Sequence, residues 1–285
     1  MASLPIPAVF VGHGTPMNAL DRNRYTEAWR AFGASIPKPR AILAVSAHWY
    51  INATAVTTMT QPPTIHDFYG FPQALFDVRY PAPGAPELAE EVADAVKPEF
   101  LGRDSDGWGI DHGTWSVLVH MFPNADVPVV QLSINAAKPL EYHPELGAKL
   151  APLRERGILI LCSGNVVHNL RRIERQRAEA AFDWNRRFDE ATRAILTEAP
   201  ADALKLREHP DYVLAAPTPD HFIPLLYLAG LAAAAGEPAG VLVEGYAMGS
   251  ISMTAFTLGM DGVQPPGGGR GAPPIDGVPG DQTNL

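Results

Sequence analysis

Five histidines in short, unusual contexts are the residues of this 285-residue chain best suited to chemistry. An unperturbed imidazole titrates near neutral pH and is a common ligand of Zn²⁺ and Fe²⁺. A group of imidazoles can therefore bind a metal ion or transfer a proton. The contexts are GHGTP, SAHW, DHG, SGNVVHN and PTPDHF, and they contain His13, His48, His112, His168 and His221.

Strands and helices must bring these histidines together. Uninterrupted apolar runs over residues 8–11, 41–45 and 158–162 are typical of buried strands, and three of the histidines follow them closely. Other apolar or amphipathic segments, separated by turn residues, predict helices over 27–32, 86–96, 115–122, 144–156, 174–198 and 222–235, and strands over 54–59, 127–134, 241–244 and 250–258. This pattern predicts an α/β protein, in which ligands bind beyond the carboxyl ends of the strands.

Two of the strands lead directly to His13 and His48, which predicts neighbouring parallel strands with both imidazoles at one edge. A single histidine near a strand end is more often a hydrogen-bonded structural residue. Here the context is repeated, and small neighbours (Gly12, Gly14 and Ala47) leave room around each ring. The repeat favours a site for a divalent metal ion.

Each of the other three histidines has two interpretations from the residues alone. His221 precedes an apolar helix and is either a third metal ligand or a polar residue at the helix start. His168 is either a general acid/base or a fourth ligand. His112, beside Asp111, either orients a ligand or substrate oxygen or caps the following helix. For the remaining histidines we expect structural roles: His66, His120, His143 and His209.

A stretch over residues 61–84 is rich in proline, glycine and aromatic residues and has no helical or strand period. Long loops in compact domains are usually functional or disordered, and the aromatic content argues against disorder. We expect this stretch to form a lid or wall over the histidine site. Asp67, Phe68 and Tyr69 are its candidate substrate-binding residues, although Asp67 also suits a turn.

Composition excludes several classes of protein. A net charge of −9 argues against a nucleic-acid groove or an anionic membrane surface as partner.

Cys162, the one cysteine, lies in an apolar run and is expected to be a buried thiol. The pattern of a signal peptide is absent and the apolar helix over 222–235 is shorter than the ~20 residues of a membrane span, so we expect a cytoplasmic protein. The Gly- and Pro-rich residues 261–285 are expected to be disordered or laid on the surface.

Six blocks of residues, in order along the chain, resemble the DOPA-dioxygenase branch of the class III extradiol ring-cleavage dioxygenases. They are HGTP (13–16), SAHW (46–49), HDFYGFP (66–72), DHGTW (111–115), SGNVVHNL (163–170) and HPDYVLAAPTPDHFIPLLY (209–227). The resemblance implies a single α/β domain over residues 1–260, with a central mixed, mostly parallel sheet flanked by helices. It also implies an enzyme that inserts O₂ into a small catechol, DOPA or a related diol, and opens the ring to a semialdehyde.

The resemblance further implies a role for each histidine. His13, His48 and His221 would bind one divalent metal ion per chain, Fe²⁺ for activity with Zn²⁺ as an alternative in the isolated protein. His168 would be the acid/base residue beside the substrate and O₂, and His112 would lie near the substrate oxygens. Some relatives in the wider superfamily use two histidines and a carboxylate, whereas the third position here is a histidine. Three neutral imidazoles leave the full charge on the metal ion, a ligand set that also suits Zn²⁺.

Two other functions fit the same residues. One is a zinc-dependent hydrolase that uses metal-bound water as its nucleophile. The other is a non-catalytic binding protein that keeps the metal ion as a structural staple. In every case we expect a monomer or small homo-oligomer, with no nucleic acid or membrane as partner.

Overall fold

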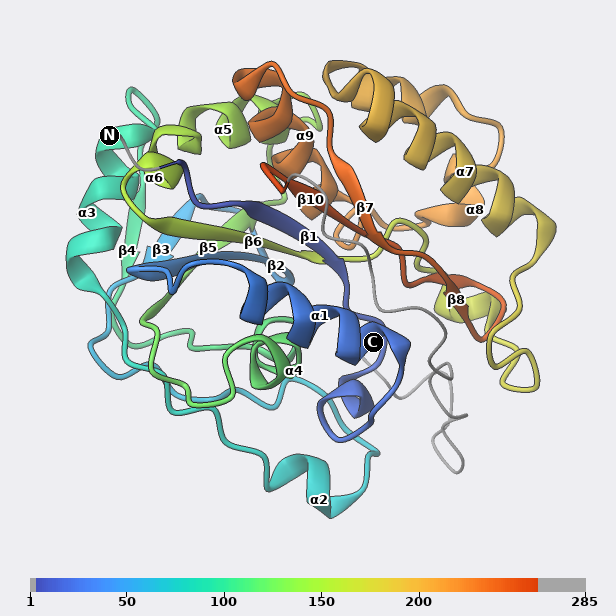
Figure 1. Ribbon diagram of the computed structural model, residues 1–285, viewed down its shortest axis with the longest axis horizontal. Coiled ribbons are helices and arrows are strands. Elements are labelled where there is room, and N and C mark those ends of the chain that lie inside the picture. Colours follow the sequence, from blue (N-terminus) through green and yellow to red (C-terminus); the bar gives the residue numbers. More distant parts are fainter. Residues whose placement is uncertain (1–3, 261–285) are drawn as a thin grey trace.

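The computed structural model describes residues 4–260, and an eight-stranded sheet runs through the middle of this part of the chain (Figure 1). Four parallel strands form its centre, in the spatial order β5 (Val129–Asn135), β2 (Ala41–Ile51), β6 (Ile158–Gly164) and β1 (Ala8–Gly12). Antiparallel pairings join this centre to the flanking strands, which are β3 (Ala55–Thr57) and β4 (Gly102–Asp104) on one side, and β10 (Ala255–Leu258) and β7 (Gly240–Val243) on the other. The predicted α/β fold with a mixed, mostly parallel sheet is confirmed.

Side chains of the central strands alternate between two apolar layers, as the pleat of a strand requires. In β1, Ala8 and Phe10 belong to one buried cluster, whereas Val9 and Val11 belong to the other. Because both faces are covered, these strands consist of continuous apolar runs. This is the physical reason that they could be recognised in the sequence.

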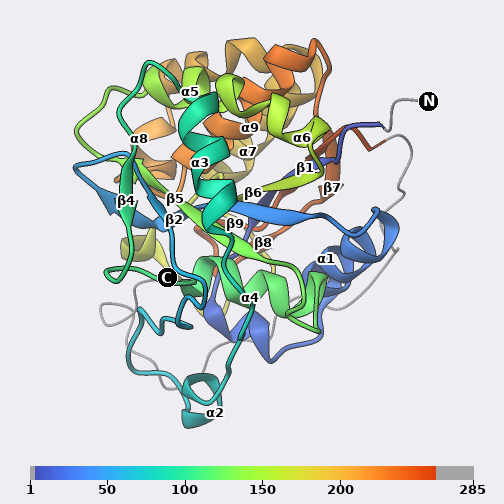
Figure 2. The same cartoon turned by 90° about the vertical axis from the view of Figure 1, so that its left-hand side faces the viewer.

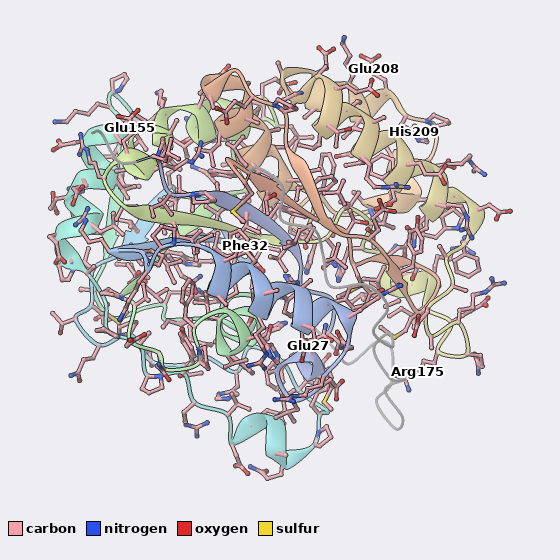
Figure 3. All side chains as sticks on the ribbon, viewed as in Figure 1. Glu27, Phe32, Glu155, Arg175, Glu208 and His209 are labelled. Atoms are coloured by element: carbon pink, nitrogen blue, oxygen red, sulfur yellow. The ribbon has the colours of Figure 1, made fainter. Side chains whose placement is uncertain are left out.

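Helices cover both faces of the sheet. Those on one face include α3 (Pro86–Ala95), α5 (Tyr142–Leu150) and α9 (Ile223–Ala235), and those on the other are α1 (Arg24–Ser35) and α4 (His112–Met121) (Figures 1 and 2). Phe32 lies fully buried between α1 and the sheet (Figure 3). The sequence sets both bounds of α9: Pro224 stands in its first turn, and Gly236 follows its last residue in the left-handed conformation with φ 67°. Tyr227 is buried within the helix.

Shorter elements complete the described chain. The remaining helices are α2 (Gln73–Phe76), α6 (Pro152–Glu155), α7 (Asp183–Glu198) and α8 (Tyr212–Ala215), with 3-10 helices over Pro16–Ala19, Leu170–Arg172 and Pro200–Glu208. A two-stranded ribbon, β8 (Tyr246–Ala247) with β9 (Ile251–Ser252), lies between β7 and β10 in the chain. No helix within residues 4–260 is long and apolar enough to cross a membrane. The predicted behaviour of residues 261–285 lies outside the described residues.

Two predictions about the central strands were wrong. β1 and β2 are not neighbours, because β6 inserts between them and pairs in parallel with both. β2 also continues beyond residue 45 to Ile51, with a register shift against β5 between Val45 and Tyr50. His48 therefore lies in an irregular section inside a strand rather than after its end. Such bulges re-aim side chains and are common beside functional sites.

Three predictions in the second half of the chain also need correction. The helix expected over 174–198 begins only at Asp183, because the backbone of Glu174 and Phe182 bonds instead to Met248 and Gly249. The helix expected over 144–156 is divided into α5 and α6, with a proline at the start of the second segment. The strand expected over 250–258 is divided into β9 and β10, and β10 pairs antiparallel with β7.

Candidate metal centre

The five histidines singled out by the sequence lie together at the carboxyl edge of the parallel strands. His13 directly follows β1, and its backbone N–H donates to the carbonyl of Gly164 at the end of β6. His168 follows β6, and His221 lies two residues before α9, whose N-cap is Phe222. His112 is the first residue of α4, whose N-cap is Asp111. Strand ends and helix starts therefore place all five imidazoles in one region, although β1 and β2 are not adjacent.

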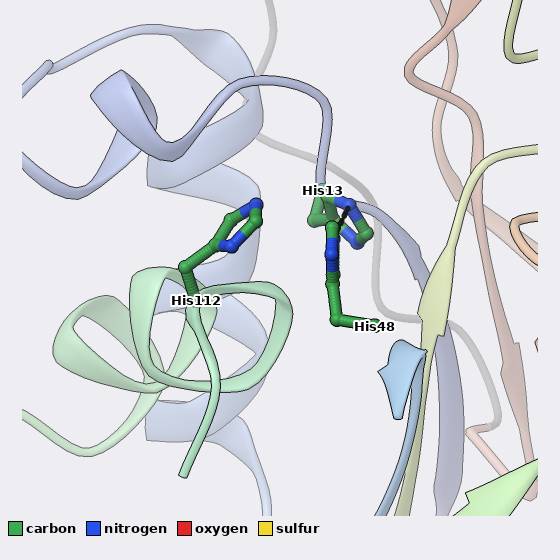
Figure 4. Close-up of side chains that lie close together, drawn as sticks. All are labelled: His13, His48 and His112. Atoms are coloured by element: carbon green, nitrogen blue, oxygen red, sulfur yellow. Dashed lines mark hydrogen bonds between the residues drawn. The ribbon is translucent and has the colours of Figure 1, made fainter. Parts of the chain in front are cut away.

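His13 and His48 make the closest pair of candidate ligands. Their Nε2 atoms face each other at 3.2 Å (Figure 4). Two imidazole nitrogens that each lie about 2.1 Å from one metal ion, with an angle of about 100° between them, are about 3.2 Å apart. The spacing therefore fits two ligands of a single ion.

Ser163 sets the protonation of His13. Its hydroxyl donates to the carbonyl of Gly113, and so its oxygen can accept a hydrogen bond from Nδ1 of His13, 2.9 Å away. That arrangement leaves the proton on Nδ1 and the lone pair on Nε2, the atom that faces His48. The pKa of His13 is held well below its usual value by burial and by the neighbouring imidazoles, which favours the neutral, metal-binding form.

Asp67 joins His48 to His112. One carboxylate oxygen lies 3.3 Å from Nδ1 of His48, and the other lies 2.9 Å from Nδ1 of His112. The backbone N–H of His112 donates to the same carboxylate at 2.9 Å. Burial alone raises the pKa of the Asp67 carboxyl group, but His112 and His48 outweigh this effect and hold the pKa below its usual value. The carboxylate therefore acts on the two imidazoles as an orienting acceptor.

His221 is oriented in a similar way by its neighbour in the chain. Its Nδ1 is hydrogen-bonded to the carboxylate of Asp220, while its Nε2 is buried and has no hydrogen-bond partner among the described residues. The centroid of its ring lies 5.3 Å from that of His13 and 5.1 Å from that of His48. The ring of His168 stacks on it at 3.5 Å, with an angle of 6° between the planes.

Nitrogen and carboxylate atoms close enough to share an ion form two adjacent groups within residues 4–260. The first is His13, His48 and His112, and the second is His168, Asp220 and His221; within each group, the potential ligand atoms lie within 4.8 Å of one another. Figure 4 shows the three rings of the first group. Nε2 of His112 is also buried without a hydrogen-bond partner among the described residues, so His112 and His221 both offer a third nitrogen. The prediction that His221 is that ligand stays a prediction.

A cavity of about 370 Å³ opens onto this region. It is lined by His48, His168 and His221 together with the nearby residues Ala47, Tyr50, Asn169, Leu170, Arg171, Pro217, Thr218 and Asp220. His112 does not line the cavity and is fully buried. The cavity therefore presents two of the three predicted metal ligands and the predicted acid/base residue.

The stretch over residues 61–84 contributes differently from what its sequence suggests. Asp67, Phe68 and Tyr69 do not line this cavity. Asp67 holds the two imidazoles, and the ring of Phe68 packs edge-on against His112, with centroids 5.3 Å apart. Tyr69 is half exposed. Contact of these three residues with substrate stays a prediction. Asp67 and Phe68 are observed to contact the histidines.

Sequence reasoning missed two residues that orient the histidines. Ser163 has no local sequence signal, because its alignment with His13 depends on β6 lying beside β1. Asp220 directly precedes His221 in PTPDHF, and this carboxylate–imidazole adjacency was a usable signal. None of the four histidines expected to be structural belongs to either potential metal group among residues 4–260.

The fold and the imidazole cluster define an α/β protein with a histidine site able to bind one divalent metal ion. Residues 6–257 match the family described as the catalytic LigB subunit of aromatic ring-opening dioxygenase, and the chain belongs to this family. It is thus an extradiol aromatic ring-opening dioxygenase, from a metal-dependent family whose substrates are an aromatic compound and O₂.

Several named proteins are similar to the chain over most of its length. A 4,5-DOPA dioxygenase extradiol of Escherichia coli is 47% identical over 263 residues, which cover 91% of this chain and 97% of the relative. A protein of the same name from Beta vulgaris is 38% identical over 236 residues, covering 80% and 86%. The crystal structure of an uncharacterised Escherichia coli protein, 42% identical, superposes with a TM-score of 0.78 over 89% of this chain and 100% of that one.

Proposed function

We propose that the chain opens the ring of a small catechol, L-DOPA or a related diol, with Fe²⁺ held by His13, His48 and His221. The observation that carries the proposal is the 3.2 Å separation of the Nε2 atoms of His13 and His48 beside a cavity of about 370 Å³. A cavity of this volume is in the range that holds small-molecule ligands. The names of the similar proteins from Escherichia coli and Beta vulgaris support DOPA as a substrate.

His221 is the better candidate for the third ligand because it lines the cavity. A metal ion bound by His13, His48 and His221 would be open to substrate on the cavity side. His112 is fully buried, does not line the cavity, and has its Nδ1 2.9 Å from the carboxylate of Asp67. We propose that His112 supports His48 through Asp67 and lies near the substrate oxygens. When bound, Fe²⁺ would supply the Lewis acidity and the redox change that allow O₂ to react with a catechol.

The protein's own residues would position the diol and move its protons. His168 lines the cavity and stacks on His221, so its imidazole lies beside any diol bound at the metal ion. We assign it the role of general base toward a hydroxyl of the diol and of general acid later in the reaction. Asp67 and Phe68 would hold His48 and His112 in place.

The overall reaction balances without an external reductant. The carbon–carbon bond beside the diol breaks, and each of its two carbons gains one oxygen atom of O₂. The ring is oxidised and O₂ is reduced, which gives a carboxylate at one new end and an aldehyde at the other.

We also propose that residues 1–260 form the catalytic domain, as a monomer or small homo-oligomer.

O₂ uptake tests this proposal. Protein loaded anaerobically with Fe²⁺ would be offered L-DOPA and simple catechols, with zinc-loaded protein as the control. We expect O₂ uptake together with new visible absorbance from a ring-opened semialdehyde, in the iron form alone. Absence of uptake with every catechol, despite a confirmed iron content, would contradict the proposal and favour a zinc-dependent hydrolase.

A further inference from the structure

The cavity contains one permanent positive charge. Among its lining residues, Arg171 is the only lysine or arginine. The other fixed charge in the wall is the carboxylate of Asp220, which is hydrogen-bonded to His221. The chain as a whole has a net charge of −9, so an arginine in the wall of the substrate cavity suggests a role in binding a negatively charged group.

Arg171 has no ion-pair partner within residues 4–260, although many other arginines of the chain do. Arg187 binds Asp211, Arg193 binds Asp189, and Arg177 binds Glu174. Arg171 is exposed and lines the cavity, so its guanidinium is accessible to a ligand there. A planar guanidinium that is free to make two parallel hydrogen bonds is well suited to bind a carboxylate.

The backbone that carries Arg171 is firmly anchored. The side-chain oxygen of Asn169 accepts from the backbone N–H of Arg171, while its amide nitrogen donates to the carbonyl of Leu214. The backbone N–H of Asn169 donates to Ser250, and that of His168 donates to Ala215. His168 and Arg171 thus leave the same hydrogen-bonded turn, which fixes the position of the arginine relative to the proposed base.

We propose that Arg171 binds a carboxylate on the side chain of the diol substrate, so that the enzyme selects catechols that carry a carboxylate. The inference rests on the proposed function, because it takes the cavity to be the site of a small aromatic diol. What it adds to the proposed function is a residue that determines specificity, Arg171, and the substrate group that this residue recognises. Catechols with a neutral or purely cationic side chain leave the guanidinium unpaired and gain nothing from it.

L-DOPA and dopamine form a matched pair of substrates for the test, because they differ only in the carboxylate. The quantity measured is the ratio of kcat/KM for L-DOPA to kcat/KM for dopamine, in wild type, Arg171→Gln and Arg171→Lys. A hydrogen-bonded charge pair of this kind corresponds to a factor of about 10 to 100, so we expect the ratio to fall by that factor in Arg171→Gln. Arg171→Lys, which keeps the charge but loses the planar fork, should retain an intermediate ratio.

Arg172→Gln is the matched control. Arg172 is the next residue in the same turn, is exposed and does not line the cavity. We expect its substitution to leave the ratio unchanged. An unchanged ratio in Arg171→Gln, an equal fall in Arg172→Gln, or a wild type that does not discriminate between L-DOPA and dopamine would each overturn the inference.

A binding measurement separates this inference from the proposed function. Zinc-loaded protein under argon would be titrated calorimetrically with L-DOPA and with dopamine, so that no turnover is needed. Tighter binding of L-DOPA that is lost in Arg171→Gln would support the carboxylate contact even if the iron form consumed no O₂. Ring opening with equal affinities for the two ligands would support the reaction and overturn the role of Arg171.

Discussion

The imidazole of His168 lies parallel to that of His221, with ring centroids 3.5 Å apart and an angle of 6° between the planes. His221 is the proposed third metal ligand, and His168 is the proposed acid/base residue. The stacking places the group that moves protons directly beside the group that binds the metal ion, so both rings face the same cavity. A proton on the diol is then within reach of His168 when the diol is bound at the metal ion.

Replacing His168 tests this division of roles. His168→Phe keeps an aromatic ring beside His221 but cannot transfer a proton. We expect kcat to fall by about 10²- to 10⁴-fold with the metal content unchanged, because removing a general acid/base removes a factor of this size. Metal analysis and steady-state kinetics on the same preparation measure both. Loss of the metal ion in this variant would instead identify His168 as a fourth ligand.

Asp67 should matter through the two histidines that it holds. In Asp67→Asn, an amide replaces the carboxylate that lies 3.3 Å from Nδ1 of His48 and 2.9 Å from Nδ1 of His112. We expect the affinity for Zn²⁺, measured by competition with a chelator, to fall about 10- to 100-fold, as is typical when such an orienting group is removed. Asp77→Asn is the control, because Asp77 lies exposed in the same stretch and bonds to Gln73. Equal affinity in both variants would contradict this role of Asp67.

Gly113 leaves the space that His48 needs. A Cβ atom at this position would lie 2.6 Å from Oγ of Ser46 and 2.7 Å from Cδ2 of His48. Alanine normally favours a helix over glycine, so Gly113→Ala in α4 should not harm the helix itself. We expect it to displace His48 and weaken Zn²⁺ binding by about tenfold. Gly240→Ala, where the nearest atom is Oγ1 of Thr257 at 3.5 Å, should bind Zn²⁺ like the wild type; a similar loss in both would refute the steric explanation.

His143 should make the stability of the protein depend on pH. This histidine is fully buried in α5, and burial lowers its pKa from 6.5 to about 4. Between these values the unfolded chain binds a proton that the folded chain does not, so the free energy of unfolding falls as the pH decreases from 6.5 toward 4. The maximal contribution is about 3 kcal/mol.

The test compares the wild type with His143→Leu, both free of metal, by chemical denaturation at pH 7 and pH 4.5. We expect the wild type to lose about 2 kcal/mol more than the variant over this interval. The other histidines contribute to both proteins and cancel in the difference. Parallel pH dependences of the two proteins would show that His143 has the same pKa in the folded and unfolded states, and would contradict this prediction.

The sequence was sufficient to predict the strands that are buried on both faces of the sheet. β1, β5 and β6 are covered on both faces, and their continuous apolar runs were recognisable. The approach of His13 and His48 was also predicted, but for a reason that proved incomplete. The carboxyl ends of parallel strands lie at the same edge of a sheet even when another strand separates them. The prediction that β1 and β2 are adjacent was therefore wrong, but the prediction that His13 and His48 lie at one edge was right.

What the sequence could not show depends on partners distant in the chain. Residues 174–182 have high helix propensity, yet backbone bonds to Met248 and Gly249 hold them in another conformation. The position of Asp67 between His48 and His112 depends on contacts across 19 and 45 residues of chain, which no local pattern encodes. The histidines of the site could therefore be predicted from the sequence, whereas the groups that orient them became apparent only in the structure.

Isotope labelling of the product tests the central claim most directly. Iron-loaded enzyme would convert L-DOPA under ¹⁸O₂ in ordinary water, and the product would be trapped quickly and analysed by mass spectrometry. The proposed ring opening predicts ¹⁸O in the new carboxylate, with a second label in the aldehyde to the extent that exchange with water allows. A product labelled only when the experiment is repeated with ordinary O₂ in H₂¹⁸O would contradict a dioxygenase reaction and identify a hydrolase.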